Sequence, residues 1–407
     1  MSVALEKPPW EQIQWNSSPA RPPTPLKVDE AAFATETPWD FNAPAELHTI
    51  KDNIASLSED VWEYYKKLTN PYELIFTTSG KYSTPPSICM LHPLSRSYFK
   101  MVEMMQVVNL TGKLVGRDRF KTAHVCEGPG GFIQAAFDEA DRNRKKVSQA
   151  VAMTLRPTEH QIPGWKRAAV FLKKHPEVKI VYGANNTGDI LDRTNRQSFY
   201  EECAHAVYLF TADGGVDFAT NYHEQERTIY PLLVASALMA VNCLTEGGVC
   251  IIKIFDSYTR PTEDLILGLA SVFRQWTLYK PATSRPCNAE QYFIGVGFKS
   301  MQSKAITNAL ERVLDNPHLP HKLWSDDAFG EQTRAQYRSL QVQRAQRQIH
   351  FITETLGLVG HLTAAQETDL WNRNIQYSKK FCTQFHLPTI PKLPVGNSFM
   401  AEDGPSA

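Results

Sequence analysis

Residues 122–132 read T-A-H-V-C-E-G-P-G-G-F, an apolar run that ends in a glycine turn. The run has the residue types of a buried strand, and the residues after Gly131 continue as a segment of helical length. In an open α/β sheet, ligands bind beyond the carboxyl ends of such strands. Glycines there let the backbone approach a ligand closely, and the helix start offers free N–H groups. Pro129 removes one of those donors, which disfavours a phosphate-binding loop; a turn needed only for folding is the alternative interpretation.

Further apolar runs follow this segment and alternate with stretches of helical length. They predict strands at 122–127, 148–154, 178–183, 206–212, 248–255, 276–280 and 291–298. This alternation favours a parallel sheet with helices on both faces. The last two runs are joined by residues 281–290 alone and predict an antiparallel pair at the sheet edge. The expected fold is therefore α/β, a Rossmann-like, doubly wound sheet of about seven strands with N- and C-terminal extensions.

Length and composition narrow the class of protein. The 407 residues suffice for one large domain with extra elements or for two domains. Lys and Arg number 43 against 43 Asp and Glu, which argues against an indiscriminate RNA-binding tail but permits a local basic face. Seven Cys without a C-x-x-C pair indicate free thiols in a reducing compartment. With no apolar run of membrane-spanning length and no signal segment, we expect an intracellular soluble protein, nuclear or cytoplasmic.

Composition also suggests domain limits. Residues 1–45 are Pro-rich and predict an arm that is extended or packs only locally. We expect the α/β domain over 46–300, with its motifs in 90–300. A helical extension is expected over 301–390, and a loose tail over 391–407.

Four charged side chains lie on separate segments: Lys100, Asp213, Lys253 and Glu290. Asp213 ends one predicted strand and should project into the cleft. Lys253 lies within another strand, where it would face either the cleft or the core. Burial of Lys253 and a second ammonium nearby would depress its pKa, so that a neutral amine could accept a proton from a hydroxyl. Asp213 and Glu290 would hold the lysines and balance their charge. A lysine at a sheet edge or snorkelling to solvent is the alternative.

Asp189 lies in the loop N-N-T-G-D-I at residues 185–190, just after the third predicted strand. Its carboxylate could accept a hydrogen bond from an exocyclic amine such as that of adenine. A turn former or helix cap is the alternative interpretation.

The ordered motifs resemble the FtsJ-type ribose 2′-O-methyltransferases, and among them the eukaryotic and viral enzymes that methylate the mRNA cap. S-R-S-Y-F-K (95–100) resembles the helix of the first catalytic Lys, and C-E-G-P-G-G-F (126–132) the methyl-donor loop. G-D-I (188–190), A-D-G-G (212–215) and K-I-F-D (253–256) are similar to further family motifs. Y-K-P-A-T-S-R-P-C-N-A-E-Q-Y (279–292) resembles the segment that separates cap enzymes from ribosomal-RNA members.

The resemblance implies S-adenosylmethionine as methyl donor, capped mRNA as substrate and no metal. It implies that Lys253 is the general base of a tetrad with Lys100, Asp213 and Glu290. The donor site it implies comprises Cys126, Glu127, Gly128, Pro129, Gly130, Gly131, Phe132, Thr154, Asp189 and Asp213. Arg96, Ser284 and Arg285 are candidate RNA contacts. One departure concerns the donor ribose, because the acidic residue that many members place after the second strand is replaced by T-L-R (154–156), with Glu159 only later.

Several alternatives stay open. The same chemistry could act on ribosomal or transfer RNA, or the fold could serve as a non-catalytic RNA-binding scaffold. Arg334, Arg338, Arg344 and Arg347 form either a basic stripe or a solvated helix face. The cap guanine is commonly held between aromatic rings, for which Tyr222, Tyr258 and the N-terminal Trp residues are candidates. Protein partners and the first or second transcribed nucleotide are undecided, and a compact chain is compatible with a large DNA virus.

Overall fold

The computed structural model describes residues 7–18, 44–77, 84–157, 164–215, 225–316, 323–325 and 327–391. The chain divides into two compact units, each assembled from segments distant in the sequence. The first comprises Met1–Asn42, Ser97–Pro281 and Glu290–Gln341, and the second Ala43–Arg96, Ala282–Ala289 and Val342–Ala407. This division does not follow the linear order of domains suggested by composition, since residues 44–96 cluster with the C-terminal helices.

The first unit is built on an eight-stranded sheet of order β1-β7-β8-β6-β5-β2-β3-β4 among the described residues. The strands are β1 (Asn16–Ser17), β2 (Arg119–Val125), β3 (Lys146–Met153), β4 (Val178–Val181), β5 (Val207–Ala212), β6 (Leu244–Ile254), β7 (Phe273–Tyr279) and β8 (Gln291–Phe298). Strands β2 to β6 pair in parallel, whereas β8 runs antiparallel to both β6 and β7. The seven predicted strands and the antiparallel final pair are confirmed.

Strand β1 lies in the N-terminal arm, which was expected to be extended or to pack only locally. Asn16 and Ser17 are extended and pair antiparallel with Trp276 and Gln275 of β7. The next residue, Ser18, donates its backbone N–H to the carbonyl of Arg274 at 3.2 Å. The arm therefore covers the outer edge of β7, whose N–H and C=O groups would otherwise lack partners. A two-residue strand has no periodicity from which it could be predicted.

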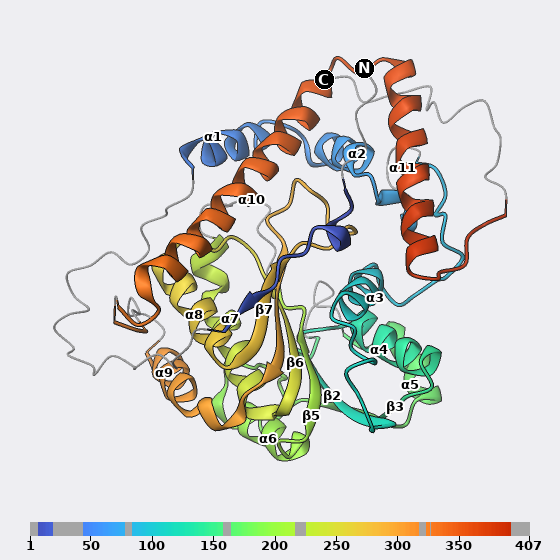
Figure 1. Ribbon diagram of the computed structural model, residues 1–407. Coiled ribbons are helices and arrows are strands. Elements are labelled where there is room, and N and C mark those ends of the chain that lie inside the picture. Colours follow the sequence, from blue (N-terminus) through green and yellow to red (C-terminus); the bar gives the residue numbers. More distant parts are fainter. Residues whose placement is uncertain are drawn as a thin grey trace. The chain divides into compact units, whose positions relative to one another are not determined.

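Helices cover both faces of this sheet (Figure 1). On one face lie α3 (Ser97–Val107), α4 (Gly131–Arg142) and α5 (Ala169–Lys174). On the other lie α7 (Gln225–Cys243) and α8 (Arg260–Ser271), while α6 (Arg193–Cys203) and α9 (Lys304–Asp315) pack against α7. Because parallel strands are covered on both faces, they read as continuous apolar runs, and all of β5 is buried.

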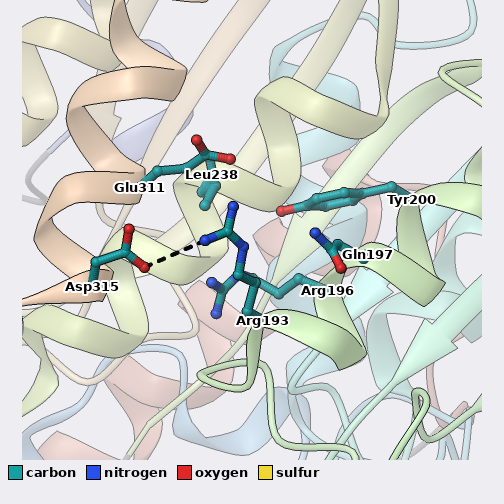
Figure 2. A pocket seen from close by; sticks show the side chains of 7 residues that line it. All are labelled: Arg193, Arg196, Gln197, Tyr200, Leu238, Glu311 and Asp315. Carbon is teal, nitrogen blue, oxygen red and sulfur yellow. Dashed lines mark ion pairs between the residues drawn. The ribbon is translucent and has the colours of Figure 1, made fainter.

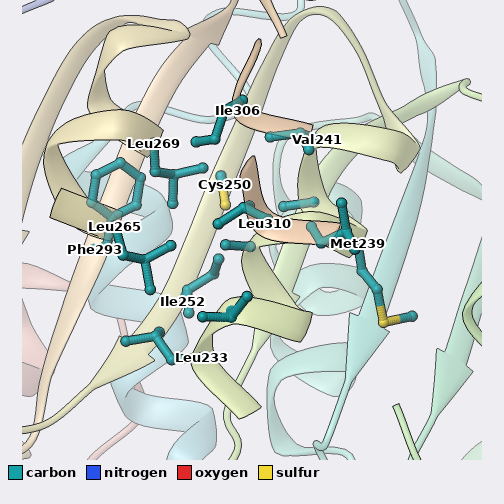
Figure 3. Packing of buried hydrophobic residues seen from close by; sticks show 14 of the residues in the cluster. Leu233, Met239, Val241, Cys250, Ile252, Leu265, Leu269, Phe293, Ile306 and Leu310 are labelled. Atoms are coloured by element: carbon teal, nitrogen blue, oxygen red, sulfur yellow. The ribbon is translucent and has the colours of Figure 1, made fainter. Parts of the chain in front are cut away.

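The hydrophobic core of this unit fixes which face of β6 carries charge. Figure 3 shows Cys250 and Ile252 of β6 packed with Phe293 of β8 and with leucines of α8 and α9. Ile254 belongs to the same cluster. Because successive residues of a strand point to opposite faces, Lys253 lies on the face away from this cluster.

The second unit is helical. It contains α1 (Ala45–Ile54), α2 (Glu59–Thr69), the C-terminal part of α10 (Gly330–Leu358) and α11 (Ala364–Gln384). A small core joins α1, α2 and α10 and includes Ile54, Trp62, Cys287, Phe351 and Ile352. Helix α11 begins with a capping box in which Thr363 and Gln366 exchange side-chain-to-backbone hydrogen bonds. No helix in the described part of the chain is long and apolar enough to cross a bilayer.

Candidate active site

The four predicted charged residues converge in the first unit as two ion pairs. Lys100 lies in the first turn of α3, Asp213 directly follows β5, Lys253 lies near the end of β6, and Glu290 directly precedes β8. Lys100 Nζ is 2.7 Å from Glu290 Oε1, and Lys253 Nζ is 3.2 Å from Asp213 Oδ1. All four side chains are between 12% and 15% exposed. They are thus shielded from bulk water but still accessible to a ligand.

A fifth residue, Tyr292 on β8, joins the two ion pairs. Its hydroxyl donates to Asp213 Oδ1 at 2.9 Å and lies 3.4 Å from Glu290 Oε1, and the residue is fully buried. Tyr292 lies in one of the motifs that resemble the family, but the sequence gave it no role. The pairing of β6 with β8 gives it one, because Tyr292 lies opposite Lys253 and paired side chains point to the same face of the sheet.

The ion pairs determine the pKa values of the site. Burial acts to lower the pKa of Lys253, but the carboxylates of Asp213 and Glu290 outweigh burial and raise it above its ordinary value. The depressed pKa expected for Lys253 is therefore wrong for the ligand-free chain. Burial acts to raise the pKa of Glu290, yet Lys100 and Lys253 lower it to about 2. In this state Lys253 is therefore protonated and Glu290 is ionised.

Ionised Glu290 should contribute to stability above pH 4.5, its ordinary pKa, and this contribution should disappear as the pH falls toward 2. The pKa difference corresponds to about 3 kcal/mol. Glu290→Gln should lower the free energy of unfolding at neutral pH, and the difference from wild type should shrink in acid. Denaturant unfolding between these pH values measures it. Glu331→Gln, at an exposed position in α10, is the control; a difference independent of pH contradicts the prediction.

The glycine turn lies beside this cluster. Gly130 has a φ of 104°, which favours glycine, and donates its N–H to the Glu127 carbonyl at 2.6 Å. Cys126 donates its N–H to the carbonyl of Met153 on β3 at 2.8 Å. A Cβ added to Gly214, the residue after Asp213, would lie 3.3 Å from the Cys126 Cβ. The loop and the ion pairs therefore occupy the same edge of the sheet.

The Glu127 side chain points away from this edge into a buried polar network. His124 Nδ1 lies 3.1 Å from Glu127 Oε2 and 2.7 Å from Thr211 Oγ1, and His124 Nε2 lies 2.8 Å from Thr122 Oγ1. The Thr211 hydroxyl also donates to Glu127. Burial raises the pKa of Glu127, while His124 acts to lower it. The carboxyl group of Glu127, one of the predicted donor contacts, is thus engaged within the protein, where it ties the loop to β2 and β5.

The Asp189 loop approaches the same edge from β4. Gly188 has a φ of 72°, and a Cβ there would lie 1.9 Å from the Thr154 carbonyl oxygen. Asp189 Oδ1 accepts a hydrogen bond from the Leu191 N–H at 2.8 Å. This contact is typical of a turn-forming aspartate, which was the alternative interpretation of Asp189. Asp189 nevertheless contributes to the electrostatics of the site. Burial and the carboxylates of Glu127, Asp189 and Asp213 raise the pKa of the Cys126 thiol to about 12, although the Lys253 ammonium acts to lower it.

Residues 93–298, just over half of the chain, match the family model described as FtsJ-like methyltransferase. The chain belongs to this family. The motifs that suggested the resemblance all fall within the matched residues.

Curated relatives of this FtsJ-like chain carry cap-specific names. A cap-specific mRNA (nucleoside-2′-O-)-methyltransferase of Autographa californica nuclear polyhedrosis virus is 29% identical over 170 residues, 42% of this chain and 61% of the relative. Enzyme 1 of that name from Leishmania braziliensis is 28% identical over 298 residues, 66% of this chain and 71% of the relative. Enzyme 1 of the same name from Dictyostelium discoideum is 27% identical over 286 residues, which cover 66% of this chain and 36% of the relative. This chain therefore spans less than two thirds of the length of the viral relative and of the Dictyostelium relative.

The predicted RNA contacts of the FtsJ-like chain have structural partners in the second unit. Arg285 Nε and Nη2 each lie 3.0 Å from a carboxylate oxygen of Glu73, and Arg96 Nη2 lies 3.4 Å from Glu73. Arg96 also donates to the Thr283 carbonyl at 3.3 Å, and Ser284 is buried. Burial acts to raise the pKa of Glu73, but the two guanidinium groups lower it. These contacts form an ion cluster around the buried carboxylate of Glu73, which joins the segments that carry Glu73, Arg96 and Arg285.

Some of the other RNA-binding candidates are buried or ion-paired, and some lie outside the described part. Arg334 is buried, with Nη1 2.6 Å from Glu263 and Nη2 3.0 Å from Asp264, so it belongs to no solvated stripe. Arg338 also pairs with Glu263, at 3.1 Å. Tyr258 is buried, with its N–H donated to Glu226. Tyr222, Trp39, Glu159 and residues 392–407 lie outside the described residues.

A hollow among helices of the FtsJ-like unit is distinct from the strand ends (Figure 2). Its lining comes from α6, α7 and α9: Arg193, Arg196, Gln197, Tyr200, Leu238, Glu311 and Asp315. Arg193 pairs with Asp315 at 3.8 Å, and Arg196 donates to the carbonyls of Ile190 and Leu191. Because both arginines already have partners within the protein, we assign no ligand to this hollow. No group of three or more potential metal ligands occurs among the described residues.

Proposed function

We propose that this chain transfers a methyl group to the ribose 2′-hydroxyl of the first transcribed nucleotide of capped mRNA. The observation that carries the proposal is the pairing of Lys253 with Asp213 and of Lys100 with Glu290 beside the glycine loop. The cap-specific names of the relatives support the substrate.

S-adenosylmethionine would supply the methyl group in this proposal. The residues present fit it: the loop from Cys126 to Phe132 offers backbone at the carboxyl end of β2, and Asp189 would face the adenine amine. Asp189 Oδ2 has no hydrogen-bond partner among the described residues and is available as an acceptor. Thr154 and Asp213 would complete the contacts. A donor ribose ligand is not assigned, because Glu159 lies outside the described residues.

Lys253 would act as the general base by accepting the proton of the 2′-hydroxyl at Nζ. Its raised pKa means that it is protonated in the ligand-free chain, so it must first lose that proton. A positive charge brought next to Lys253 favours this loss, because like charges disfavour the ammonium form. Asp213 would orient Nζ, and Lys100 with Glu290 would position the hydroxyl. Alignment of two bound substrates would supply much of the rate enhancement.

Methylation of matched capped and uncapped oligonucleotides with labelled S-adenosylmethionine tests this function. We expect transfer to the capped RNA, with the label on the 2′-oxygen of its first transcribed nucleotide. Equal transfer to both RNAs would indicate a ribosomal- or transfer-RNA type of substrate. No transfer to any RNA by the wild-type chain, despite RNA binding, would indicate a non-catalytic scaffold.

Tyr292→Phe should lower kcat about tenfold and change KM little, because the variant keeps the ring and loses the hydroxyl between Asp213 and Glu290. Without that donor, Asp213 attracts the Lys253 proton more strongly, so activity should be partly restored at higher pH. Tyr279→Phe is the matched control, since Tyr279 lies opposite Tyr292 on β7, is buried, and donates to Glu103. Equal kcat and pH profiles for the two variants would exclude this role.

A further inference from the structure

A dense concentration of positive charge lies at the amino ends of β2 and β3. Residues 113–121 (K-L-V-G-R-D-R-F-K) and 142–146 (R-N-R-K-K) contain eight Lys or Arg and one Asp. The chain as a whole has a formal net charge of zero, so these two segments depart strongly from its average. We call their eight cationic side chains the basic edge: Lys113, Arg117, Arg119, Lys121, Arg142, Arg144, Lys145 and Lys146.

The sheet brings the two segments together. Arg119 at the start of β2 lies opposite Lys146 at the start of β3 in the parallel register. Lys146 donates its backbone N–H to the Asp118 carbonyl at 2.8 Å, and Lys145 Nζ lies 3.2 Å from Asp118 Oδ1. Backbone pairing within the first unit therefore places the start of β2 beside the start of β3, and the cations of the basic edge flank these two strand starts.

Most of this charge is not neutralised by the protein. Three of its cations have carboxylate partners: Arg142 with Glu139, Lys145 with Asp118, and Lys146 with Glu177. Within the described ranges, the other five have no ion pair: Lys113, Arg117, Arg119, Lys121 and Arg144. Three of those five, Arg117, Arg119 and Arg144, are exposed arginines. This contrasts with Arg334, whose guanidinium is buried between two carboxylates.

The chemistry of the basic edge favours nucleic acid over protein. Protein interfaces have an apolar centre, whereas interfaces with nucleic acid are polar and strongly positive. Val115 is the one large apolar side chain recorded as exposed in these two segments, at 85%. Arginine forks match the oxygens of phosphate in pairs. The proposed substrate is itself a polyanion.

We propose that the basic edge binds the phosphate backbone of the RNA substrate, at nucleotides distant from the one that is methylated. This inference rests on the proposed function. The donor loop follows the carboxyl end of β2, and the basic edge lies at the amino end of the same seven-residue strand. At about 3.3 Å per residue the two sites are about 20 Å apart. A short capped oligonucleotide in the catalytic site would not reach the basic edge, whereas a long RNA would.

Binding of a long uncapped RNA by the full chain at several salt concentrations tests the proposal. The variant is Arg117→Gln/Arg119→Gln/Arg144→Gln. Loss of three phosphate contacts should reduce the slope of log affinity against log salt by about 2 and weaken binding about 100-fold at 0.1 M salt. Lys166→Gln/Arg167→Gln/Lys304→Gln, which removes three exposed cations elsewhere in the same unit, should change neither. Thermal unfolding should be alike for both.

Methyl transfer provides the second readout. In the basic-edge variant, KM for a long capped RNA should rise while kcat stays unchanged, and a capped RNA of about two nucleotides should be methylated as by wild type. An unchanged salt slope and affinity would overturn the proposal and favour an acidic protein as the partner of this surface. Because RNA binding is measured without methyl transfer, a wild-type chain that binds long RNA through this edge but methylates none would contradict the proposed function alone.

Discussion

Lys253→Arg is expected to lower the rate of methyl transfer by about 10²–10⁴-fold, the usual contribution of a general base. Arginine keeps the positive charge opposite Asp213, from which Lys253 Nζ is 3.2 Å, so the ion pair and the fold should survive. It cannot release its proton at the pH of the assay, and so it cannot accept one from a hydroxyl. Donor binding, measured by calorimetry, should stay within about twofold of wild type because the lost interaction is made only during the reaction.

The pH dependence separates this explanation from simple damage. Since Asp213 and Glu290 raise the pKa of Lys253, kcat/KM of the wild-type chain should increase as the pH rises and the amine becomes neutral. The residual rate of Lys253→Arg should lack this increase. Lys299→Arg is the matched control: Lys299 donates to Ser18 Oγ at 2.7 Å and contacts none of the four charged residues. Substantial activity in Lys253→Arg would remove Lys253 from the role of base.

Gly188→Ala should destabilise the donor side of the site by about 2–4 kcal/mol. Two effects add at this position. The φ of 72° is unfavourable for alanine, and the new Cβ would lie 1.9 Å from the Thr154 backbone oxygen, which cannot rotate away as a side chain can. The loop must therefore move, and Asp189 moves with it. We expect a lower midpoint of denaturant unfolding and a donor affinity reduced at least about tenfold.

Gly247→Ala isolates the backbone strain. Gly247 has a φ of 80°, and a Cβ there would meet nothing within 4 Å. This variant should lose about 1–2 kcal/mol through strain alone, with unchanged donor affinity. Equal losses in both variants would mean that the approach of Gly188 to Thr154 does not matter for the site.

The parts of the fold that sequence predicted are those with strong local signals. Most of the predicted strands are buried and read as uninterrupted apolar runs, and β4 is mostly apolar although only partly buried, which is why β2 to β8 were found. Convergence of Asp213 and Lys253 followed because β5 and β6 are parallel, and the carboxyl ends of parallel strands meet at one edge. The glycine turn was placed at that edge for the same reason.

The parts that sequence did not predict depend on contacts between distant segments. The second unit combines residues 44–96, 282–289 and those from 342 onward, and no local pattern in the sequence indicates that association. Arg96 and Arg285, the candidate RNA contacts, both pair with Glu73, which is more than twenty residues from either in the sequence. The pKa of Lys253 was predicted in the wrong direction because burial was counted and the strength of two nearby carboxylates was not.

Strands β5, β6 and β8 are adjacent in the interior of the sheet, and they position Asp213, Lys253, Glu290 and Tyr292. Interior strands open to solvent only when a whole cooperative unit opens, so their amides should be among the slowest in the chain to exchange hydrogen. Heat inactivation should then coincide with the loss of tertiary structure and not precede it. The proposed chemistry would thus be confined to the least mobile part of the molecule, and any motion needed to admit substrates would fall to the loops around it.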